Sequence, residues 1–203
     1  GSTAYVTLEP CNHEGKTGPC SEHLIKVGVK KVVFAASDPG VAAAGGAKRL
    51  KEAGIEVRGP VENFSLGEGV DPAFFYSARY DHTYLALKLA VSKDDKIAET
   101  VGVRTFLTGE QANTEVHRIR SGFDGIVVGA NTLRADDPFL TVRELPYEPR
   151  LPPARIVISS DGDLCIQSNL FGSIGRSPVL VIAGETTSAN SINRLRSAGA
   201  IVE

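Results

Sequence analysis

The sequence predicts an α/β protein built from parallel strands, and three observations indicate this. Short runs of apolar and β-branched residues, such as 31–36, alternate with segments of helical pattern. Glycine ends several of the helical segments, as Gly28 and Gly54 do. The connections are short, and single helices between strands are typical of parallel βαβ units.

The first 80 residues contain the clearest alternation. The expected strands are 4–8, 31–36 and 55–57, and the expected helices are 22–27 and 47–53. Ser21 is placed to cap the first of these helices, because a serine hydroxyl accepts a hydrogen bond from a free backbone N–H at a helix start. Residues 60–82 carry Pro, Gly and a cluster of Phe and Tyr. We expect them to form an irregular helix and the linker to a second domain.

The alternation restarts after this linker. The expected strands are 84–91, 105–107, 125–128, 155–159 and 179–183, the expected helices are 108–121 and 188–198, and 144–153 is a Pro-rich loop. Thr108 and Gln111 have the spacing of a capping box. The last four residues have the pattern of a strand that is just beginning. We therefore expect two α/β domains, at 1–80 and 81–203.

Composition limits the class of protein. The 203 residues are 42% hydrophobic and 23% charged, which is ordinary for a globular chain and argues against disorder. The net charge of −2 provides no general basic surface, so nucleic acid is not an expected partner. No apolar run approaches the ~20 residues that cross a bilayer, so no membrane is expected either.

Other features concern location and assembly. No basic-then-apolar leader is present, and three cysteines do not make a disulfide framework, so we expect a cytoplasmic protein. The chain has no Met and both of its ends look cut, which predicts a part of something longer. We also expect a homo-oligomer.

Two cysteines mark the most informative loop. Each of Cys11 and Cys20 follows a proline, nine residues apart, at a strand-to-helix junction. Thiolates bind zinc, and a helix N-terminus stabilises thiolate charge. The spacing alone leaves open two reduced structural thiols without a metal. Cys165 stands alone and is expected to be a half-buried small apolar residue.

This loop carries a family resemblance. Its motif is Leu8-Glu9-Pro10-Cys11-x-His13 followed by Gly18-Pro19-Cys20. It resembles the zinc loop of the riboflavin-pathway pyrimidine deaminases, which belong to the cytidine-deaminase superfamily. The resemblance implies that Cys11 and Cys20 are two of three zinc ligands, and that His13 and Lys16 hold the phosphate end of the substrate. A solvated loop lysine is the alternative for Lys16.

The same family takes its third zinc ligand and its catalytic Glu from a His-x-Glu motif upstream of this loop. That motif is absent from these 203 residues. A catalytic zinc needs three protein ligands and a base for its bound water. We therefore expect no deaminase activity from these residues alone.

A lysine interrupts the apolar run at 84–91. An isolated buried charge is costly, so Lys88 is expected either at the end of a strand or facing a ligand.

A second resemblance covers most of the remaining chain. The motifs that carry it are Leu87-Lys88-Leu89-Ala90-x-Ser92-x-Asp94, Phe106-Leu107-Thr108-Gly109, His117-Arg118-Ile119-Arg120, Asp124-Gly125-Ile126-Val127-Val128-Gly129, and Thr132 to Arg143. They resemble the riboflavin-pathway reductase, which has the dihydrofolate-reductase-like fold. A deaminase loop followed by this domain is similar to the bifunctional deaminase/reductase family of riboflavin biosynthesis. The implied fold is a partial cytidine-deaminase-like domain followed by a partial dihydrofolate-reductase-like domain.

The resemblance implies specific roles for residues of the second half. The NADPH positions are Ala90, Phe106, Thr132 and Asp136; the substrate positions are Arg104, Arg120, Leu140 and Arg143; and Lys88 is the catalytic lysine. Two of these residues depart from the family pattern. Phe106 stands where many relatives have Trp, and Arg104 stands at a position associated with a small polar contact to the substrate. Without the resemblance, the arginines could bind phosphates, and Asp136-Asp137-Pro138 could be only a turn.

The implied function is a pair of reactions. A zinc-dependent deamination of a phosphoribosylated diaminopyrimidinone would precede an NADPH-dependent reduction of its ribosyl chain to ribityl. Two alternatives remain: a reductase whose deaminase half is inactive, and a non-catalytic zinc- and nucleotide-binding module.

Overall fold

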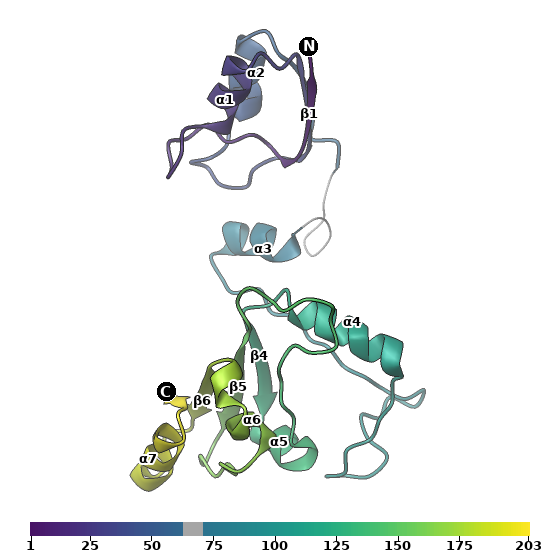
Figure 1. Ribbon diagram of the computed structural model, residues 1–203, viewed down its shortest axis with the longest axis vertical. Coiled ribbons are helices and arrows are strands. Elements are labelled where there is room, and N and C mark those ends of the chain that lie inside the picture. The colour runs from purple at the N-terminus through teal and green to yellow at the C-terminus, as the bar shows by residue number, and fades with distance from the viewer. Residues whose placement is uncertain (63–70) are drawn as a thin grey trace. The chain divides into compact units, whose positions relative to one another are not determined.

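The computed structural model describes residues 1–62 and 71–203, and every strand pair in that part of the chain is parallel. The chain divides into two compact units, Gly1–Leu87 and Lys88–Glu203 (Figure 1). Each unit has its own sheet, three-stranded in the first and four-stranded in the second. The predicted α/β class with parallel sheets is therefore confirmed.

The first unit is a short βαβαβ segment. Its sheet has the order β1 (Thr3–Leu8), β2 (Lys31–Ala36) and β3 (Glu56–Arg58), and its helices are α1 (Cys20–Lys26) and α2 (Gly46–Glu52). The two helices lie side by side next to the sheet (Figure 1). Alternate residues of β2 are buried, and Val32 packs with Leu50 of α2 in the core. The predicted strands and helices of this unit are present to within two residues of their expected ends.

The described part of the expected linker contains a regular helix. Helix α3 (Pro72–Tyr80) begins where the Asp71 side chain accepts a hydrogen bond from the Phe74 N–H at 3.0 Å, with Pro72 in its first turn. Such a start satisfies a free N–H and tolerates proline. Residues 63–70 of the predicted linker lie outside the described residues.

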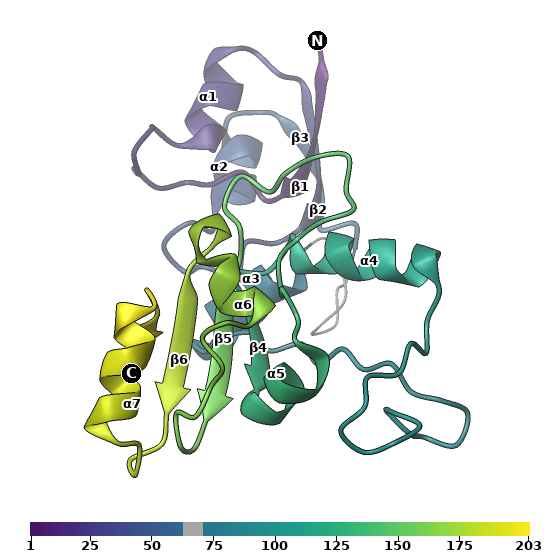
Figure 2. The same ribbon diagram turned by 60° about the horizontal axis from the view of Figure 1, so that its bottom comes forward.

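The second unit has a four-stranded parallel sheet and four α-helices. Its strands are β4 (Gly125–Gly129), β5 (Ala154–Ser159), β6 (Val179–Ala183) and β7 (Ile201–Val202), in that order. Its helices are α4 (Glu110–Arg120), α5 (Ala130–Asp136), α6 (Asn169–Gly172) and α7 (Ala189–Ser197), with a 3₁₀ turn, η1, at Ile174–Arg176. Figure 2 shows β4, β5 and β6 as neighbouring arrows that point the same way.

The core of this unit lies between the sheet and α5 to α7. Leu133, Leu170 and Leu195 come from these three helices and pack with Val157 and Val181 of the sheet. The opposite sheet face is more exposed: Val127, Ile158, Ile182 and Ile201 stay about half exposed, and Ile156 and Leu180 are partly buried.

A fully buried arginine holds the second unit together at its centre. The Arg155 guanidinium donates to the carbonyl oxygens of Phe139, Leu170, Ser173 and Ser177, at 2.7–3.2 Å. It also donates to the Ser173 hydroxyl at 2.8 Å. Burial lowers the pKa of Arg155, and nearby Arg176 adds to this shift. This cation is therefore stabilised by backbone dipoles, and it joins the loop before β5 to the segment between α6 and β6.

Two predicted strands were wrong. Residues 84–91 and 105–107 form no strand, and Leu85, Leu87 and Leu89 are exposed. Lys88 is exposed and lies in no strand, so a place at the end of a strand was wrong, and its place facing a ligand stays a prediction. The apolar pattern reports that a segment can be buried, but a strand forms only where a neighbouring strand pairs with its backbone. Neither described sheet includes these residues.

Local capping also differed from the prediction. Helix α1 starts at Cys20, and the buried Ser21 hydroxyl donates to the Asn12 side-chain oxygen at 3.0 Å instead of capping the helix. Helix α4 starts after Gly109, and the Thr108 hydroxyl contacts Asn113. Ser188 does cap α7, because its hydroxyl accepts a hydrogen bond from the Ser191 N–H.

Cys165 is exposed, so the expectation of half burial was wrong.

Helices α5 and α6 were not predicted. Helix α5 follows β4 without a loop, because its first residue directly succeeds Gly129. Its seven residues are too few to show a clear helical period. Asp137, with a left-handed φ of 39°, ends it, and Pro138 follows.

Candidate functional sites

The first candidate site is the cysteine loop between β1 and α1. The Cys20 N–H donates to the Cys11 sulfur at 3.3 Å, and the Ser21 N–H donates to the Cys11 carbonyl at 3.1 Å. A hydrogen bond with the Cys11 thiol, together with burial, raises the pKa of Cys20. The structure thus brings together two thiols that are nine residues apart in sequence.

Helix α2 fixes the start of this loop. The Glu9 carboxylate accepts the Ala47 N–H at 2.9 Å, in the first turn of α2, and the Asn12 N–H donates to the Ala43 carbonyl. A Cβ on Gly46 would lie 1.7 Å from the Pro10 carbonyl oxygen, so only glycine allows this close approach. Glu9 therefore has a positioning role that its place in the motif did not indicate.

The other residues predicted for this site point to solvent. His13 and Lys16 are exposed, and neither forms a hydrogen bond or ion pair with another residue that the structure describes. Across residues 1–62 and 71–203, no group of three His, Cys, Asp or Glu side chains is arranged to hold a metal ion. The two thiols are thus the only part of a zinc ligand set in the described residues.

The second candidate site is a cluster of arginines at the end of α4. His117 and Arg120 lie three residues apart and share one helix face. Arg143 lies in the loop after α5, and its backbone N–H donates a hydrogen bond to His117 Nδ1 at 3.2 Å. Burial and the charge of Arg143 lower the pKa of Arg120, while Glu144 opposes the shift. We name this set, His117, Arg120, Arg143 and Glu144, the arginine cluster.

This cluster has the charge of an anion-binding site. Among the described residues, none forms a hydrogen bond with the Arg120 guanidinium, whereas Arg143 contacts the Thr141 hydroxyl at 3.4 Å. Among the described carboxylates, Glu144 is the one that acts on the pKa of Arg120, and its side chain is 53% exposed. Two adjacent, partly desolvated cations repel each other, and a phosphate bound between them would relieve that repulsion.

The loop 137–144 that carries Arg143 has an unusual backbone. Asp137, Leu140 and Glu144 all have positive φ values, from 39° to 59°. Such values are uncommon outside glycine and persist only where neighbouring contacts impose them. Asn169 of α6 donates to both Asp137 carboxylate oxygens, and Arg155 donates to the Phe139 carbonyl. The loop is therefore held in a fixed conformation.

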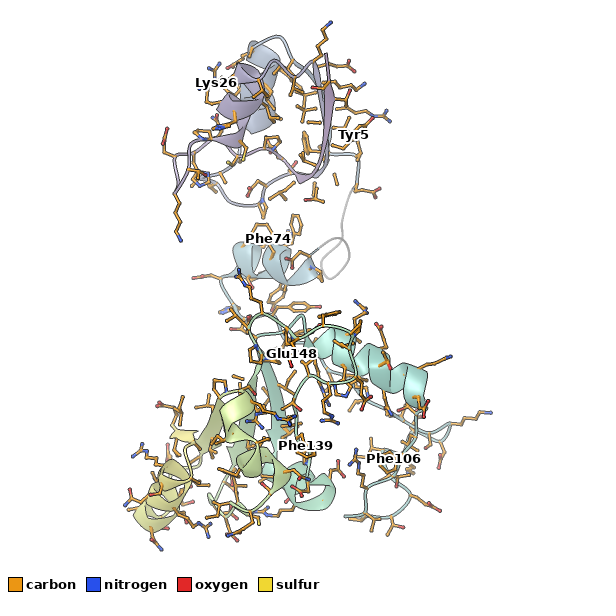
Figure 3. The ribbon with its side chains drawn as sticks, viewed as in Figure 1. Tyr5, Lys26, Phe74, Phe106, Phe139 and Glu148 are labelled. Atoms are coloured by element: carbon orange, nitrogen blue, oxygen red, sulfur yellow. The ribbon has the colours of Figure 1, made fainter. Side chains whose placement is uncertain are left out.

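The predicted reductase residues fall into three groups. Arg120, Leu140 and Arg143 lie at the arginine cluster or its loop, although Leu140 is buried in the core and not open to a ligand. Thr132 and Asp136 lie one helical turn apart on α5. Lys88, Ala90, Arg104 and Phe106 lie on the irregular segment before α4, where the Arg104 guanidinium stacks 4.5 Å from the Phe106 ring. Figure 3 shows Phe106 on this segment and Phe139 near the sheet.

Two residues important for the geometry, His117 and Arg155, were not predicted. His117 is 4% exposed and Arg155 is fully buried. For His117 a signal existed, because it precedes Arg120 by three residues on a predicted helix and so shares its face. Arg155 gave no signal, since an arginine at the start of an apolar strand normally extends to solvent.

The known family that matches this chain is described as the RibD C-terminal domain, and the match covers residues 83–203. The chain belongs to this family. RibD proteins named for riboflavin biosynthesis are similar over a longer range: one from Synechocystis is 36% identical over 196 residues, which is 96% of this chain and 52% of that protein. One from Actinobacillus pleuropneumoniae is 42% identical over 163 residues, which is 79% of this chain and 42% of that protein.

Solved RibD structures are similar along nearly the whole chain. Acinetobacter baumannii RibD has a TM-score of 0.74 at 32% identity, covering 99% of this chain and 55% of that one. A Thermotoga maritima diaminohydroxyphosphoribosylaminopyrimidine deaminase/5-amino-6-(5-phosphoribosylamino)uracil reductase has a TM-score of 0.72 at 27% identity, covering 98% and 60%. The chain spans about half the length of the curated RibD relatives that it matches. In the part described here, no helix has the length and apolarity to span a membrane.

The stability of this RibD-family chain is expected to fall on mild acidification. Burial, Arg120 and Arg143 lower the pKa of His117, with Glu144 and a backbone hydrogen bond to Thr141 opposing the shift. The unfolded chain then binds a proton at this residue before the folded chain does. The contribution of His117 to the free energy of unfolding is fully present above its unfolded-state pKa of about 6.5. It is lost as the pH falls from there through the lower folded-state pKa.

Urea denaturation at a series of pH values between about 7 and 5 measures this effect. His117→Asn, which cannot titrate, should have a flatter pH profile over this range. The other three histidines are exposed and remain in both proteins as an internal control. Parallel profiles for the two proteins would contradict the prediction.

Proposed function

We propose that the whole protein to which these residues belong acts in riboflavin biosynthesis. Residues 83–203 would carry a reductase that uses NADPH to convert the ribosyl chain of a phosphoribosylaminopyrimidine to ribityl. The observation that carries this proposal is the arginine cluster, where Arg120 and Arg143 offer two partly desolvated cations to one anion. A phosphate monoester on the sugar is the anion that this substrate supplies. Similarity to the Thermotoga reductase supports the same substrate class.

The chain's own residues would divide the work. Arg143 would form a charge-assisted fork with the phosphate, and Arg120 would supply the second cation. The fixed backbone of the loop 137–144 would hold the phosphate at one place, and so orient the sugar carbon. Lys88 would orient a sugar hydroxyl or supply a proton to it, once the segment that carries Lys88 lies against the substrate.

NADPH would supply the hydride. The residues that fit it best are Thr132 and Asp136 on α5, which begins directly after the carboxyl end of β4. Ligands of parallel α/β sheets bind outside the carboxyl ends of the strands. A side chain on Gly129, at that end of β4, would meet no atom within 4 Å, so the backbone there is open to a ligand. Ala90 and Phe106 remain cofactor positions by resemblance.

The test of the reductase uses the full-length protein with the deaminated substrate. NADPH oxidation followed by absorbance, together with a ribityl product identified by mass spectrometry, would support the proposal. Substrate binding without NADPH turnover would contradict it and favour the non-catalytic alternative. The assay also identifies the small-molecule partner.

Two other expectations need separate measurements. Sedimentation of the same sample tests the expected homo-oligomer, and fractionation of the source cells tests the expected cytoplasmic location.

We also propose that the first unit contributes to a zinc-dependent deaminase in the full-length protein. Cys11 and Cys20 would be two of the zinc ligands, since their sulfur atoms are brought together at the start of α1. His13 and Lys16 would contact the phosphate end of the deaminase substrate from the same loop. By the same resemblance, the third ligand would come from a His-x-Glu motif upstream of this loop; residues 1–62 and 71–203 hold no group of three metal-ligating side chains.

Replacing Cys11 with Ser in the full-length protein is expected to lower bound zinc to well below one per chain and to abolish deamination. The physical reason is that a serine hydroxyl does not replace a thiolate as a zinc ligand. Metal analysis and ammonia release measure the two effects. The reductase activity of the same variant is the control and should not change, because no predicted reductase residue lies in the first unit's cysteine loop.

Cys165→Ser, at the exposed cysteine of the second unit, is the matched variant and should keep both zinc and deamination. Unchanged zinc in Cys11→Ser would overturn the ligand assignment. Full zinc with no ammonia release in the unsubstituted protein would indicate the alternative of a reductase whose deaminase half is inactive.

A further inference from the structure

We propose that His117 is a positioning residue for the phosphate-binding arginines: its neutral imidazole accepts the Arg143 N–H and so fixes the loop that carries the Arg143 guanidinium. This inference rests on the proposed function, because it assigns a role in the phosphate site of the reductase.

The geometry defines the protonation state that this role needs. His117 is 4% exposed, and its Nδ1 lies 3.2 Å from the Arg143 nitrogen, which donates to it. A ring nitrogen that accepts a hydrogen bond carries no proton, so the neutral tautomer has its proton on Nε2. Nε2 faces the Glu144 carboxylate, 3.9 Å away. A protonated Nδ1 would instead direct its hydrogen at the Arg143 N–H, and the contact would be lost.

The position of this contact along the loop explains why it matters. Asn169 holds Asp137, at the beginning of the loop 137–144, and Arg155 holds Phe139 near its middle. His117 holds the end of the loop, because it binds the backbone N–H of Arg143, whose side chain would bind the phosphate. Leu140 and Glu144, on either side of Thr141 to Arg143, have left-handed backbone conformations that need such anchors. Without the His117 contact, the backbone of Arg143 loses its hydrogen bond to α4.

The charges around His117 favour its neutral form. Arg120 faces it from α4, and Arg143 and Glu144 face it from the loop; these are the charged groups that act on its pKa. The two arginines lower that pKa more than Glu144 raises it. The charge of a phosphate dianion bound to the same arginines would raise the pKa of His117, whereas a phosphate that binds best beside the neutral, positioning imidazole would lower it by linkage. The tautomer of His117 and the dependence of phosphate affinity on a hydrogen-bond acceptor at this position therefore test the positioning role, because a histidine that only packs beside the arginines needs neither.

The experiment uses the 203-residue chain and inorganic phosphate as the probe. Nitrogen-edited NMR of the imidazole reports the tautomer and the pKa of His117, and the Arg143 amide signal reports the hydrogen bond. We expect an unprotonated Nδ1 near neutral pH and loss of the Arg143 hydrogen bond as His117 becomes protonated; a protonated Nδ1 near neutral pH would overturn the positioning role. The variants at position 117 lack this imidazole, so their phosphate affinity is measured from the backbone amide signal of residue 143, with circular dichroism to show that each variant is folded.

Three substitutions separate positioning from packing. His117→Leu removes the acceptor and should weaken phosphate binding about three- to tenfold, the loss expected for one hydrogen bond. His117→Asn places an amide oxygen close to the position of Nδ1 and should restore most of the affinity. His117→Gln places its amide near Nε2 instead and should bind like the Leu variant. The Asn and Gln pair keeps the test decisive even if the Leu variant fails to fold.

The outcomes distinguish this inference from the proposed function. If Arg143→Ala abolishes phosphate binding while His117→Leu and His117→Gln bind as well as the unsubstituted chain, the positioning role is overturned and the phosphate site stands. If phosphate binds equally with and without the Arg143 guanidinium, the phosphate site is itself wrong, and the role of His117 falls with it.

Discussion

Replacing Arg155 with leucine is expected to lower the free energy of unfolding of the Lys88–Glu203 unit by about 3–5 kcal/mol. The substitution leaves the carbonyl oxygens of Phe139, Leu170, Ser173 and Ser177 without their common donor. The Leu170 and Ser173 carbonyls also accept from the Ser173 hydroxyl and the Arg176 N–H, so the Phe139 and Ser177 carbonyls are the two left unsatisfied. Each unsatisfied buried acceptor costs about 1–3 kcal/mol, and the lost hydrogen bonds of the charged guanidinium add to this. The total stays at about 3–5 kcal/mol, because removal of Arg155 also removes the cost of burying its charge, and because leucine fills part of the space.

Urea denaturation followed by circular dichroism measures the loss, and amide exchange of β5 assigns it to the second unit. The matched control is Arg118→Leu on α4. Arg118 is exposed and its partner is Glu115, three residues before it on the same helix, so its replacement should move the midpoint little. Equal midpoints for the two variants would show that the Arg155 hydrogen bonds do not stabilise the unit.

The second large effect concerns catalysis by the full-length reductase. Arg143→Ala is expected to raise the KM for the phosphorylated substrate about ten- to a hundredfold, since loss of a charge-assisted fork costs about 1.5–3 kcal/mol and each ~1.4 kcal/mol is a factor of ten. The kcat should change less, because the phosphate is remote from the carbon that is reduced. Steady-state kinetics at saturating NADPH measure both constants.

The opposite split is expected for Lys88→Ala, where kcat falls and KM changes little, because a group near the reacting sugar acts mainly on the transition state. Arg143→Lys keeps the charge without the fork and should lie between Arg143→Ala and the unsubstituted enzyme. Arg118→Ala, on the same helix as Arg120 but in an exposed ion pair, is the control and should leave both constants unchanged. A KM within about twofold of the unsubstituted value for Arg143→Ala would show that Arg143 is a surface residue and not a phosphate ligand.

The strands of the two sheets and the helices between them could be predicted because local composition and periodicity indicate them. Strands β2, β5 and β6 are short β-branched runs between turn residues, and buried parallel strands select such runs whatever surrounds them. Helix α7 begins at Ser188 and is followed by Gly199, and both ends follow from local backbone chemistry. The segment 84–91 has an equally strong apolar pattern, yet it is not a strand, because pairing depends on a neighbour that the segment does not encode.

The candidate sites divide along the same line. Spacing and residue type singled out Cys11 and Cys20, and the motif around Arg120 and Arg143 indicated the substrate positions. No pattern showed that the Arg143 N–H would meet a buried His117 from another element, 26 residues earlier in the chain. A contact of that kind is created only when α4 and the loop 137–144 pack together.

The sequence by itself determined the α/β class, the order of most strands and helices, and the residue types available for zinc and phosphate chemistry, because these depend on local periodicity and local composition. The tertiary structure alone decided which of those residues meet. It brought Cys11 next to Cys20 and Arg120 next to Arg143. It also placed Arg155 at the centre of the second unit and left Lys88 exposed to solvent. Burial and hydrogen bonding between distant segments are properties of the packed chain, since each depends on atoms that the local sequence does not specify.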